Sequence, residues 1–287
     1  MRPGILLTLI VLVIPAFFFS SNSGDSKESR AATSVYDRVT GSGKLRCAYA
    51  LYNPGCMKDP NTGKLSGIGI EALELVAGNL GLAIEWTEEV GWGTMIEGLE
   101  TNRYDIVATP VWATANRARI VDFSDPLYFS PVCAYVKEGD RRFDGDISGL
   151  NSKQFTIATI DGATAEIIAQ EDYPEVKRLS LPQMTEFGQL LLTVSTGKAD
   201  ATFTEPADAA LFIKSNPGSV RRVGAPVRVF PNCWLFRRGQ MEFKEMIDTA
   251  LSQLNNSGAL DRIIEHHEPA PGILYRTAEP YRRALSR

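Results

Sequence analysis

The sequence predicts an α/β fold containing two series of strands and helices around mostly parallel sheets. From about Thr40 onward, short apolar runs alternate with amphipathic segments, which is the pattern of βα units. A second series with the same architecture but a different sequence follows the charged stretch from Lys137 to Asp146. The 287 residues, 44% hydrophobic and 22% charged, suit one large domain or two modest ones and exclude a disordered or fibrous chain.

The first series contains five predicted elements. Ile70, Leu73, Val76 and Leu80 recur at helical spacing, whereas the short apolar runs indicate strands. Strands are predicted over residues 45–49, 83–87 and 105–109, and helices over 69–80 and 94–101.

The second series predicts strands over residues 155–159, 176–179 and 201–204 and helices over 163–170, 185–196 and 206–214. A strand over 233–236 and two helices over 241–255 and 259–267 follow, and Ser257-Gly258 between the helices is a helix-end signal. The remaining residues, 269–287, are rich in proline and arginine, and we expect a loose C-terminal extension.

The N-terminus carries a targeting signal. Gly4 to Phe19 contains no charged residue, follows Arg2, and gives way to a polar stretch that runs to about Thr40. An apolar run of this length falls short of the roughly 20 residues needed to span a bilayer. A basic start followed by a short apolar segment is typical of a secretory signal peptide. We therefore expect residues 1–30 to be a signal peptide and polar linker, with a retained N-terminal anchor as the alternative.

The composition excludes several classes of function. Thirty Lys plus Arg against thirty-four Asp plus Glu give a formal charge of -4, which argues against a nucleic-acid partner. The only histidines, His266 and His267, lie near the C-terminus, which counts against most hydrolase mechanisms. Adjacent helical side chains point about 100° apart, so these two cannot share a metal ion. Gly67, Gly69 and Ala72 fit a dinucleotide fingerprint formally, but the run follows a turn and not a long buried strand. We expect no metal and no cofactor.

The four cysteines leave two interpretations open. Cys47, Cys56, Cys133 and Cys233 contain no C-x-x-C pair and have no nearby histidine to complete a zinc site. In an oxidising compartment they allow two disulfides, for which we predict Cys47 with Cys56 and Cys133 with Cys233. The alternative is four buried thiols packed as small apolar groups.

One stretch carries the most information about function. Tyr104-Asp105 precedes an apolar run, and Thr114 to Arg117 and Val121 to Pro126 then read T-x-x-R and V-D-F-S-x-P. In these motifs the chain resembles the extracytoplasmic solute-binding proteins of family 3. Gly67 to Leu82 and Gly197 to Ala201 resemble two further family segments, so the resemblance runs from about Lys44 to Glu268.

The resemblance implies a periplasmic-binding-protein-like fold of type II, with two lobes and a ligand cleft between them. Residues 41–138 with 233–268 would form the first lobe, and residues 139–232 the second. The implied function is the capture of an amino acid or similar small carboxylate-bearing solute, delivered to the permease of an ABC transporter. The protein would be a monomer and not an enzyme, exported to the periplasm or an equivalent extracytoplasmic space.

The resemblance also implies the charged residues of the site. Arg117 matches the family arginine that binds a ligand carboxylate, and a guanidinium can donate two parallel hydrogen bonds to such a group. Thr164 falls where a loop enters a helix, whose N-terminal N–H groups can hold the same carboxylate. Simple N-capping by Thr164 is compatible with this role. Glu205 occupies the position where amino-acid-binding members usually carry an Asp for the α-ammonium. Its longer side chain also allows an amine elsewhere on the ligand.

Aromatic residues complete the predicted site. Tyr52 and Trp92 align with the aromatics that enclose the ligand side chain, although core packing is an equal alternative for Trp92. Trp112 would fill cleft volume, and Pro110 cannot donate a backbone N–H where other members often have small polar residues. Gly69 replaces a residue that is often acidic. These departures leave the identity of the solute open.

Two other functions stay open. An enzyme of the cyclohexadienyl (arogenate or prephenate) dehydratase type resembles these binding proteins and adds a general acid, for which Asp208 is the candidate carboxylate. A surface Asp that favours the N-terminus of its helix is the simpler interpretation of Asp208. A membrane-anchored ligand sensor is the third function and would depend on a retained N-terminal anchor.

Overall fold

The protein is described here by a computed structural model that covers residues 34–182 and 185–277. The predicted signal peptide and linker, residues 1–30, lie outside the described residues, as do residues 278–287 of the predicted extension. Among the helices of the described part, none is long and apolar enough to cross a membrane.

The strands form one large sheet with parallel ends and an antiparallel centre. They are β1 (Lys44–Tyr49), β4 (Ala83–Glu89), β5 (Ile106–Trp112), β6 (Val121–Phe123), β7 (Tyr128–Lys137), β8 (Thr156–Ile160), β9 (Lys177–Leu181), β10 (Ala201–Thr204) and β11 (Val220–Arg237). The order is β4-β1-β5-β11-β7-β10-β8-β9, with β6 beside β11. β1 runs parallel to β4 and β5, and β8 runs parallel to β9 and β10. The contacts of β11 with β5 and β7, and of β7 with β10, are antiparallel. A separate hairpin joins β2 (Met57–Lys58) to β3 (Leu65–Ser66).

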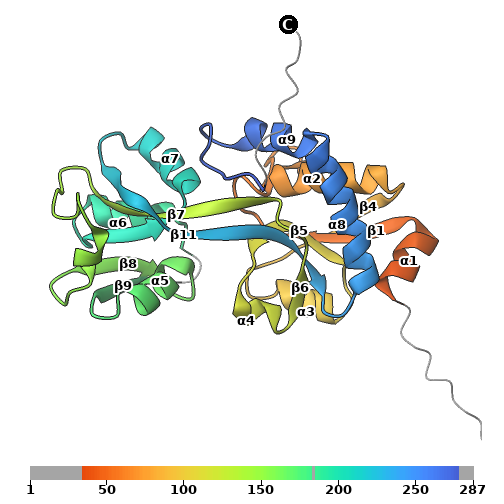
Figure 1. Cartoon of the computed structure of the whole chain (residues 1–287), viewed down its shortest axis with the longest axis horizontal. Helices are drawn as coiled ribbons and strands as arrows, with labels where there is room; N and C mark the ends of the chain where they lie inside the picture. The colour runs from red at the N-terminus through yellow and green to blue at the C-terminus, as the bar shows by residue number, and fades with distance from the viewer. Residues whose placement is uncertain (1–33, 183–184, 278–287) are drawn as a thin grey trace, which may run out of the picture. The chain divides into compact units, whose positions relative to one another are not determined.

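The helices flank the two ends of this sheet (Figure 1). At one end lie α1 (Val35–Ser42), α2 (Ile68–Asn79), α3 (Met95–Glu100), α4 (Ala115–Ala118), α8 (Met241–Asn256) and α9 (Ala259–His267). At the other lie α5 (Thr164–Asp172), α6 (Gly188–Ser195) and α7 (Pro206–Ser215), and a 3₁₀ turn, η1, spans Ile147–Leu150. β7 and β11 cross from one group to the other, which gives the predicted two-lobe α/β fold.

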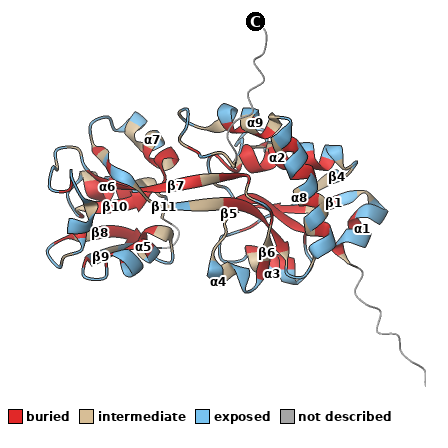
Figure 2. Cartoon of the chain, in the orientation of Figure 1, coloured by how far each residue is buried: buried red, intermediate tan, exposed pale blue. Residues whose placement is uncertain are grey.

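Each lobe has its own apolar core (Figure 2). Buried residues of α1, β1, α2, α8 and α9 pack together in the first lobe, and a smaller cluster around Met95 and Tyr104 packs beside them. In the second lobe, residues between Val132 and Val223 form a single cluster. β7 and β11 contribute to both lobes, because Tyr128 lies in the first core and Val132 in the second. The lobe boundaries at residues 138 and 232 stay a prediction.

The two crossing strands are where the sequence analysis fell short. No strand was predicted over β7, and only residues 233–236 of the 18-residue β11 were recognised. β7 is buried on both faces along most of its length, so it shows no apolar and polar alternation. Pro131 and Pro231 also oppose strand formation in the sequence, yet Pro131 pairs with Val229 and Pro231 with Phe129 in the sheet.

Both ends of the described chain are more ordered than expected. Ser34 caps α1 within the stretch predicted as a polar linker, and its hydroxyl accepts a hydrogen bond from the Asp37 N–H at 3.0 Å. The expectation of a loose extension is wrong for residues 269–277. Leu274 is buried in the first core, and Tyr275 exchanges two backbone hydrogen bonds of 2.8 Å with Phe129 of β7. We attribute this order to burial of the apolar Leu274. The prediction of a loose extension considered only the prolines and arginines of this segment.

The disulfide prediction is wrong as well. All four cysteines are free and buried, so the alternative of packed thiols is confirmed. Cys133 pairs with Thr204 of β10, whereas Cys233 pairs with Val111 of β5, which places them beside different strands. Burial raises the pKa of each thiol, which keeps it protonated and unreactive.

Candidate ligand-binding site

The loop after β1 brings Tyr52 to the second lobe. Two backbone hydrogen bonds between Tyr52 and Cys56 close this loop. Thr109 of β5 fixes its start, because the Thr109 hydroxyl donates to the Ala50 carbonyl at 2.7 Å and accepts from the Ala50 N–H at 2.8 Å. The Tyr52 hydroxyl then donates a hydrogen bond to Oε1 of Glu205. This contact joins two residues that are 153 positions apart and lie in different lobes.

Gly69 and Pro110, noted as departures from the family pattern, form a close contact. A Cβ added at Gly69 would lie 2.3 Å from Cδ of Pro110 and 2.4 Å from the Ala108 carbonyl oxygen. Heavy atoms cannot approach that closely, so no side chain fits at this position. The first turn of α2 therefore packs directly on β5, and the acidic side chain found in other members has no room here.

Glu205 is the most deeply buried charged residue of the site, with 3% of its surface exposed. It is the N-cap residue of α7, and Pro206 follows at the first helical position, where its fixed φ suits a helix start. Burial, reinforced by the neighbouring Asp208, raises the pKa of Glu205. Hydrogen bonds from Tyr52, Ser130 and Trp112 oppose that shift by stabilising the carboxylate.

Asp208 is not the surface carboxylate that its sequence position suggested. It lies in the first turn of α7 and is half-buried. Burial raises its pKa, and the Thr204 hydroxyl donates a hydrogen bond to its Oδ2 at 3.3 Å. The local sequence could not reveal this, because burial depends on segments that are distant in the sequence, such as β7, whose Tyr128 interacts electrostatically with Asp208.

Arg117 lies on the short helix α4, which follows β5 after a two-residue loop. Trp112 is the last residue of β5. The Thr114 hydroxyl caps the helix by accepting from the Arg117 N–H. Nη1 of Arg117 donates to the Trp112 carbonyl at 3.0 Å, and burial lowers the pKa of the guanidinium. Arg117 forms no ion pair with any Asp or Glu of the residues that the structure covers. Its other N–H groups are thus available to a carboxylate from solution.

Trp112 links the two charged residues. Its backbone carbonyl accepts from Arg117, and its indole stabilises the Glu205 carboxylate by hydrogen bonding. The ring stacks on Phe230 of β11, with centroids 4.5 Å apart and planes 10° from parallel. The prediction that Trp112 occupies space between the lobes is consistent with this position beside Glu205.

Trp92 is an exposed aromatic residue, so the core-packing interpretation is wrong. It is 45% exposed, and its ring meets the edge of Tyr52 at a centroid distance of 5.7 Å. Five of the six predicted residues therefore form one connected series: Trp92, Tyr52, Glu205, Trp112 and Arg117.

Thr164 is not part of that series of contacts. It is the first residue of α5 and Ala163 is the N-cap residue, so Thr164 does not cap the helix with its side chain as expected. The carboxylate of Glu166 instead accepts from the Gly162 N–H at 2.7 Å. The role of Thr164 in ligand binding stays a prediction.

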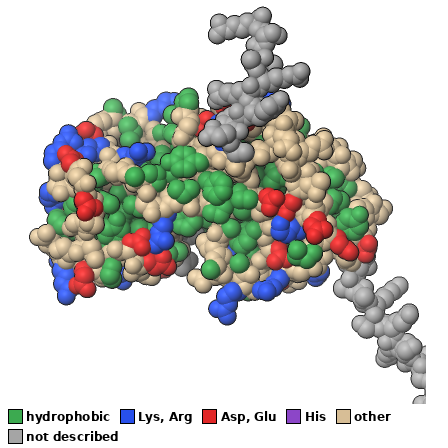
Figure 3. Space-filling view, viewed as in Figure 1, with side chains coloured by type: hydrophobic (Ala, Val, Ile, Leu, Met, Phe, Trp, Pro, Cys, Tyr) green, Lys and Arg blue, Asp and Glu red, His purple; other side chains and the backbone are tan. Residues whose placement is uncertain are grey.

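The sequence analysis missed three residues of this region: Tyr128, Ser130 and Phe230. All three lie on β7 or β11, the strands whose alternation is lost by burial or proline. The hydroxyl of Tyr128 is fully buried and has no hydrogen-bond partner among the described residues. A space-filling view shows hydrophobic side chains gathered where these strands cross between the lobes (Figure 3).

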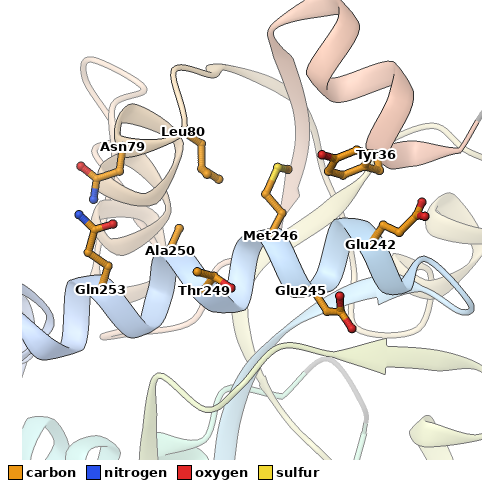
Figure 4. Close-up of a pocket in the computed structure, with 9 residues that line it drawn as sticks. All are labelled: Tyr36, Asn79, Leu80, Glu242, Glu245, Met246, Thr249, Ala250 and Gln253. Carbon is orange, nitrogen blue, oxygen red and sulfur yellow. The ribbon is translucent and has the colours of Figure 1, made fainter.

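Two open pockets lie away from these residues, along α8 of the first lobe. Figure 4 shows one whose lining comes from α1, α8 and the end of α2. Most of its side chains are exposed, and Glu242 and Glu245 point outward from α8 without a buried partner that would fix them. A second pocket continues along α8 toward Asp125. Neither contains a predicted site residue, and the described residues include no group of three metal-ligating side chains.

The chain is similar in sequence and fold to known amino-acid-binding proteins. L-cystine-binding protein TcyA of Bacillus subtilis is 24% identical over 272 residues, which cover 92% of this chain and 96% of that protein. The glutamine-binding protein GlnH of an ABC transporter in the same organism is 24% identical, over 90% of this chain and 92% of its own. The crystal structure of the ancestral amino acid-binding protein AncCDT-1, a precursor of cyclohexadienyl dehydratase, is 27% identical. Its TM-score is 0.69, over 82% of this chain and 99% of its own.

A family model matches most of the folded part, from residue 45 to residue 269. That span contains the second lobe, most of the first lobe, the crossing strands and every predicted site residue. The chain therefore belongs to the bacterial extracellular solute-binding proteins, family 3.

Proposed function

We propose that the protein binds an amino acid between its lobes and delivers it to the permease of an ABC transporter. The observation that carries this proposal is that half-buried Arg117 is bound by one carbonyl, that of Trp112, whose side chain also stabilises the buried carboxyl of Glu205. A guanidinium and a carboxylate separated by one tryptophan complement the carboxylate and ammonium of a zwitterion. The relatives named for cystine and glutamine support the same class of ligand.

The two lobes provide the signal for transport. β7 and β11 are the strands that join the lobes, and Tyr52 and Glu205 meet across them. A ligand that bridges Arg117 and Glu205 would stabilise one arrangement of the lobes over others, because a ligand shifts an equilibrium by its differential affinity. The permease would recognise that arrangement. The lobe boundaries are 41–138 with 233–268, and 139–232, and the protein acts as a monomer exported by its N-terminal segment.

Binding without catalysis is the function that we infer over dehydratase activity. The raised pKa of Glu205 and of Asp208 would suit a general acid, and this is the observation that favours an enzyme. Glu205 is, however, held by Tyr52, Ser130 and Trp112, so it is positioned as an acceptor. We expect no conversion of prephenate or arogenate when either is incubated with the protein and the products are followed by absorbance.

The Arg117→Ala variant tests the proposal. A thermal-shift screen against the standard amino acids first identifies a ligand, because a compound bound only by the folded protein raises its melting temperature. Calorimetry with that amino acid should then show an affinity at least about 30-fold lower for Arg117→Ala, since a lost charge partner in a desolvated site costs about 2–5 kcal/mol.

Arg119→Ala is the matched control. Arg119 ends the same short helix, but its side chain is exposed and outside the contacts around Trp112. Its substitution should leave the affinity unchanged. If Arg117→Ala and Arg119→Ala bind the amino acid equally well, the proposed site is wrong.

A further inference from the structure

Asp208 is a carboxyl of the site to which the proposed function assigns no role. It follows Glu205 by three positions, so both carboxyls lie at the start of α7, on the same side of the first turn. The two groups influence each other, since the charge of Asp208 is one cause of the raised pKa of Glu205. The Glu205 side chain makes no capping hydrogen bond to α7, so helix capping does not explain why this carboxyl is buried.

The two carboxyls differ in how many protein side chains stabilise their charged form. Glu205 accepts a hydrogen bond from the Tyr52 hydroxyl, and the side chains of Ser130 and Trp112 further stabilise its carboxylate form. Asp208 accepts from the Thr204 hydroxyl at 3.3 Å. The protein therefore stabilises the charge of Asp208 with fewer side chains than that of Glu205.

Tyr128 gives a second, independent indication of a ligand group. Its side chain is fully buried, its hydroxyl has no hydrogen-bond partner in the described structure, and it interacts electrostatically with Glu205 and Asp208. Buried polar groups of folded proteins are nearly always hydrogen-bonded, so this oxygen is suited to accept from a ligand N–H. A group with several N–H donors could bind Asp208 and Tyr128 together.

The charges of the site define the ligand. Arg117 contributes one positive charge, and Glu205 and Asp208 contribute two negative charges when ionised. A zwitterion would satisfy Arg117 and one carboxylate, and the second carboxyl would have to stay protonated or be left as an unpaired charge, which is costly in a desolvated place. A ligand with a further cationic group removes that cost, and the aromatic rings of Tyr52 and Trp92 also favour a cation.

We propose that Asp208, together with Glu205 and Tyr128, binds a second cationic group, so that the protein selects amino acids of net charge +1. This inference rests on the proposed function and adds the class of solute. It makes Asp208 a specificity-determining residue.

The test compares ligands that differ only in the cation. L-lysine is compared with L-norleucine, and L-arginine with L-citrulline, by calorimetry at one pH and ionic strength. In at least one of these pairs, the unmodified protein should bind the cationic member about 10–100-fold more tightly, as expected for hydrogen bonds to a charged group. In Asp208→Asn the ratio should fall to below about threefold, whereas Asp208→Glu should keep a preference for the cation.

Glu242→Gln is the matched control, because Glu242 is also a carboxylate in the first turn of a helix but lies exposed on α8. It should keep the full ratio, and circular dichroism shows whether each variant is folded. A ratio near one in both pairs for the unmodified protein overturns this inference even if Asp208→Asn does not fold, and so does an unchanged ratio in Asp208→Asn. If neutral amino acids bind and depend on Arg117, the proposed function survives that outcome. If no amino acid binds, the proposed function fails first.

Discussion

The two charged residues on either side of Trp112 lie in contrasting surroundings. Arg117 is half-buried on a four-residue helix, and its guanidinium donates to one backbone carbonyl. Glu205 is almost fully buried at the start of a ten-residue helix and receives hydrogen bonds from three side chains of three different segments. The arginine end is therefore incomplete without a ligand, whereas the acidic end is assembled by folding itself.

This difference separates affinity from stability. A charged group that stays partly hydrated in the folded protein contributes mainly to the free energy of ligand binding. A buried ionisable group affects the free energy of unfolding at all times, because its environment changes between the folded and unfolded chains. Substitutions at the acidic end should therefore change stability in the absence of ligand, whereas those near the exposed aromatics should change affinity alone.

The largest effect expected from this contrast is a loss of stability with rising pH. Burial raises the pKa of Glu205 to about 8 and that of Asp208 to about 7. Carboxyls with a raised pKa in the folded state bind protons more tightly there than in the unfolded chain. The stability that they contribute is present below about pH 4 and is lost as the pH rises through 7 and 8. Urea unfolding of the ligand-free protein should show a decrease on the order of 6 kcal/mol between pH 5 and pH 8.

The double variant Glu205→Gln with Asp208→Asn should flatten this pH profile. The range stops at pH 8 because the buried thiols, whose pKa is also raised, begin to lower stability above it. Aspartates whose pKa is lowered, such as Asp59 and Asp140, act below this range. One pKa unit corresponds to about 1.4 kcal/mol. If the free energy of unfolding changes by less than about 1 kcal/mol between pH 5 and pH 8, neither carboxyl is effectively desolvated.

A smaller effect is expected for Tyr52→Phe. The variant removes a hydrogen bond to Glu205 and should destabilise the ligand-free protein by about 1–2 kcal/mol at pH 8, where the carboxylate form needs the donor most. The loss should be smaller at pH 5, because Glu205 is then protonated. Urea titrations at both pH values measure the difference. Tyr49→Phe is the control, since that hydroxyl accepts from Lys58 and not from the site, and equal losses in the two variants would contradict the contrast.

The smallest effect is expected for Trp92→Ala. Trp92 is 45% exposed, so its removal should leave the melting temperature nearly unchanged. The affinity for the amino acid should fall by about two- to fivefold, as expected for an aromatic contact worth about 0.5–1 kcal/mol at an exposed position. Trp92→Phe keeps a ring and should retain most of the affinity. A clear drop in the melting temperature of Trp92→Ala would instead identify the ring as a structural support.

The sequence predicted elements well where one face or one ridge is apolar. The strand over residues 201–204 and the helix over 259–267 have the predicted bounds, because their periodicity and end signals are local. Prediction failed at β7 and β11, whose burial comes from neighbours on both sides and whose prolines are tolerated by their place in the sheet. The residues missed around the site, Tyr128, Ser130 and Phe230, lie on those two strands.

The candidate site divides in the same way. The T-x-x-R motif predicted Arg117, the family resemblance predicted Glu205, Tyr52 and Trp92, and Trp112 was predicted as a departure from the family pattern. The contacts among them could not be predicted, because Tyr52 and Glu205 are separated by 153 positions. The burial of Asp208 was likewise invisible, since the groups that desolvate a first-turn Asp belong to other segments.

The sequence by itself determined the α/β alternation, the approximate position of most helices and strands in the two series, the family and the charged residues on which ligand binding is proposed to depend. These properties follow from local periodicity and from motifs whose residues are close together in the chain. Only the tertiary structure decided that Pro110 excludes a side chain at Gly69, that Tyr275 pairs with β7, and that Glu205 and Asp208 share a desolvated place. Close approach and desolvation depend on which distant segments meet, and that is settled when the lobes pack.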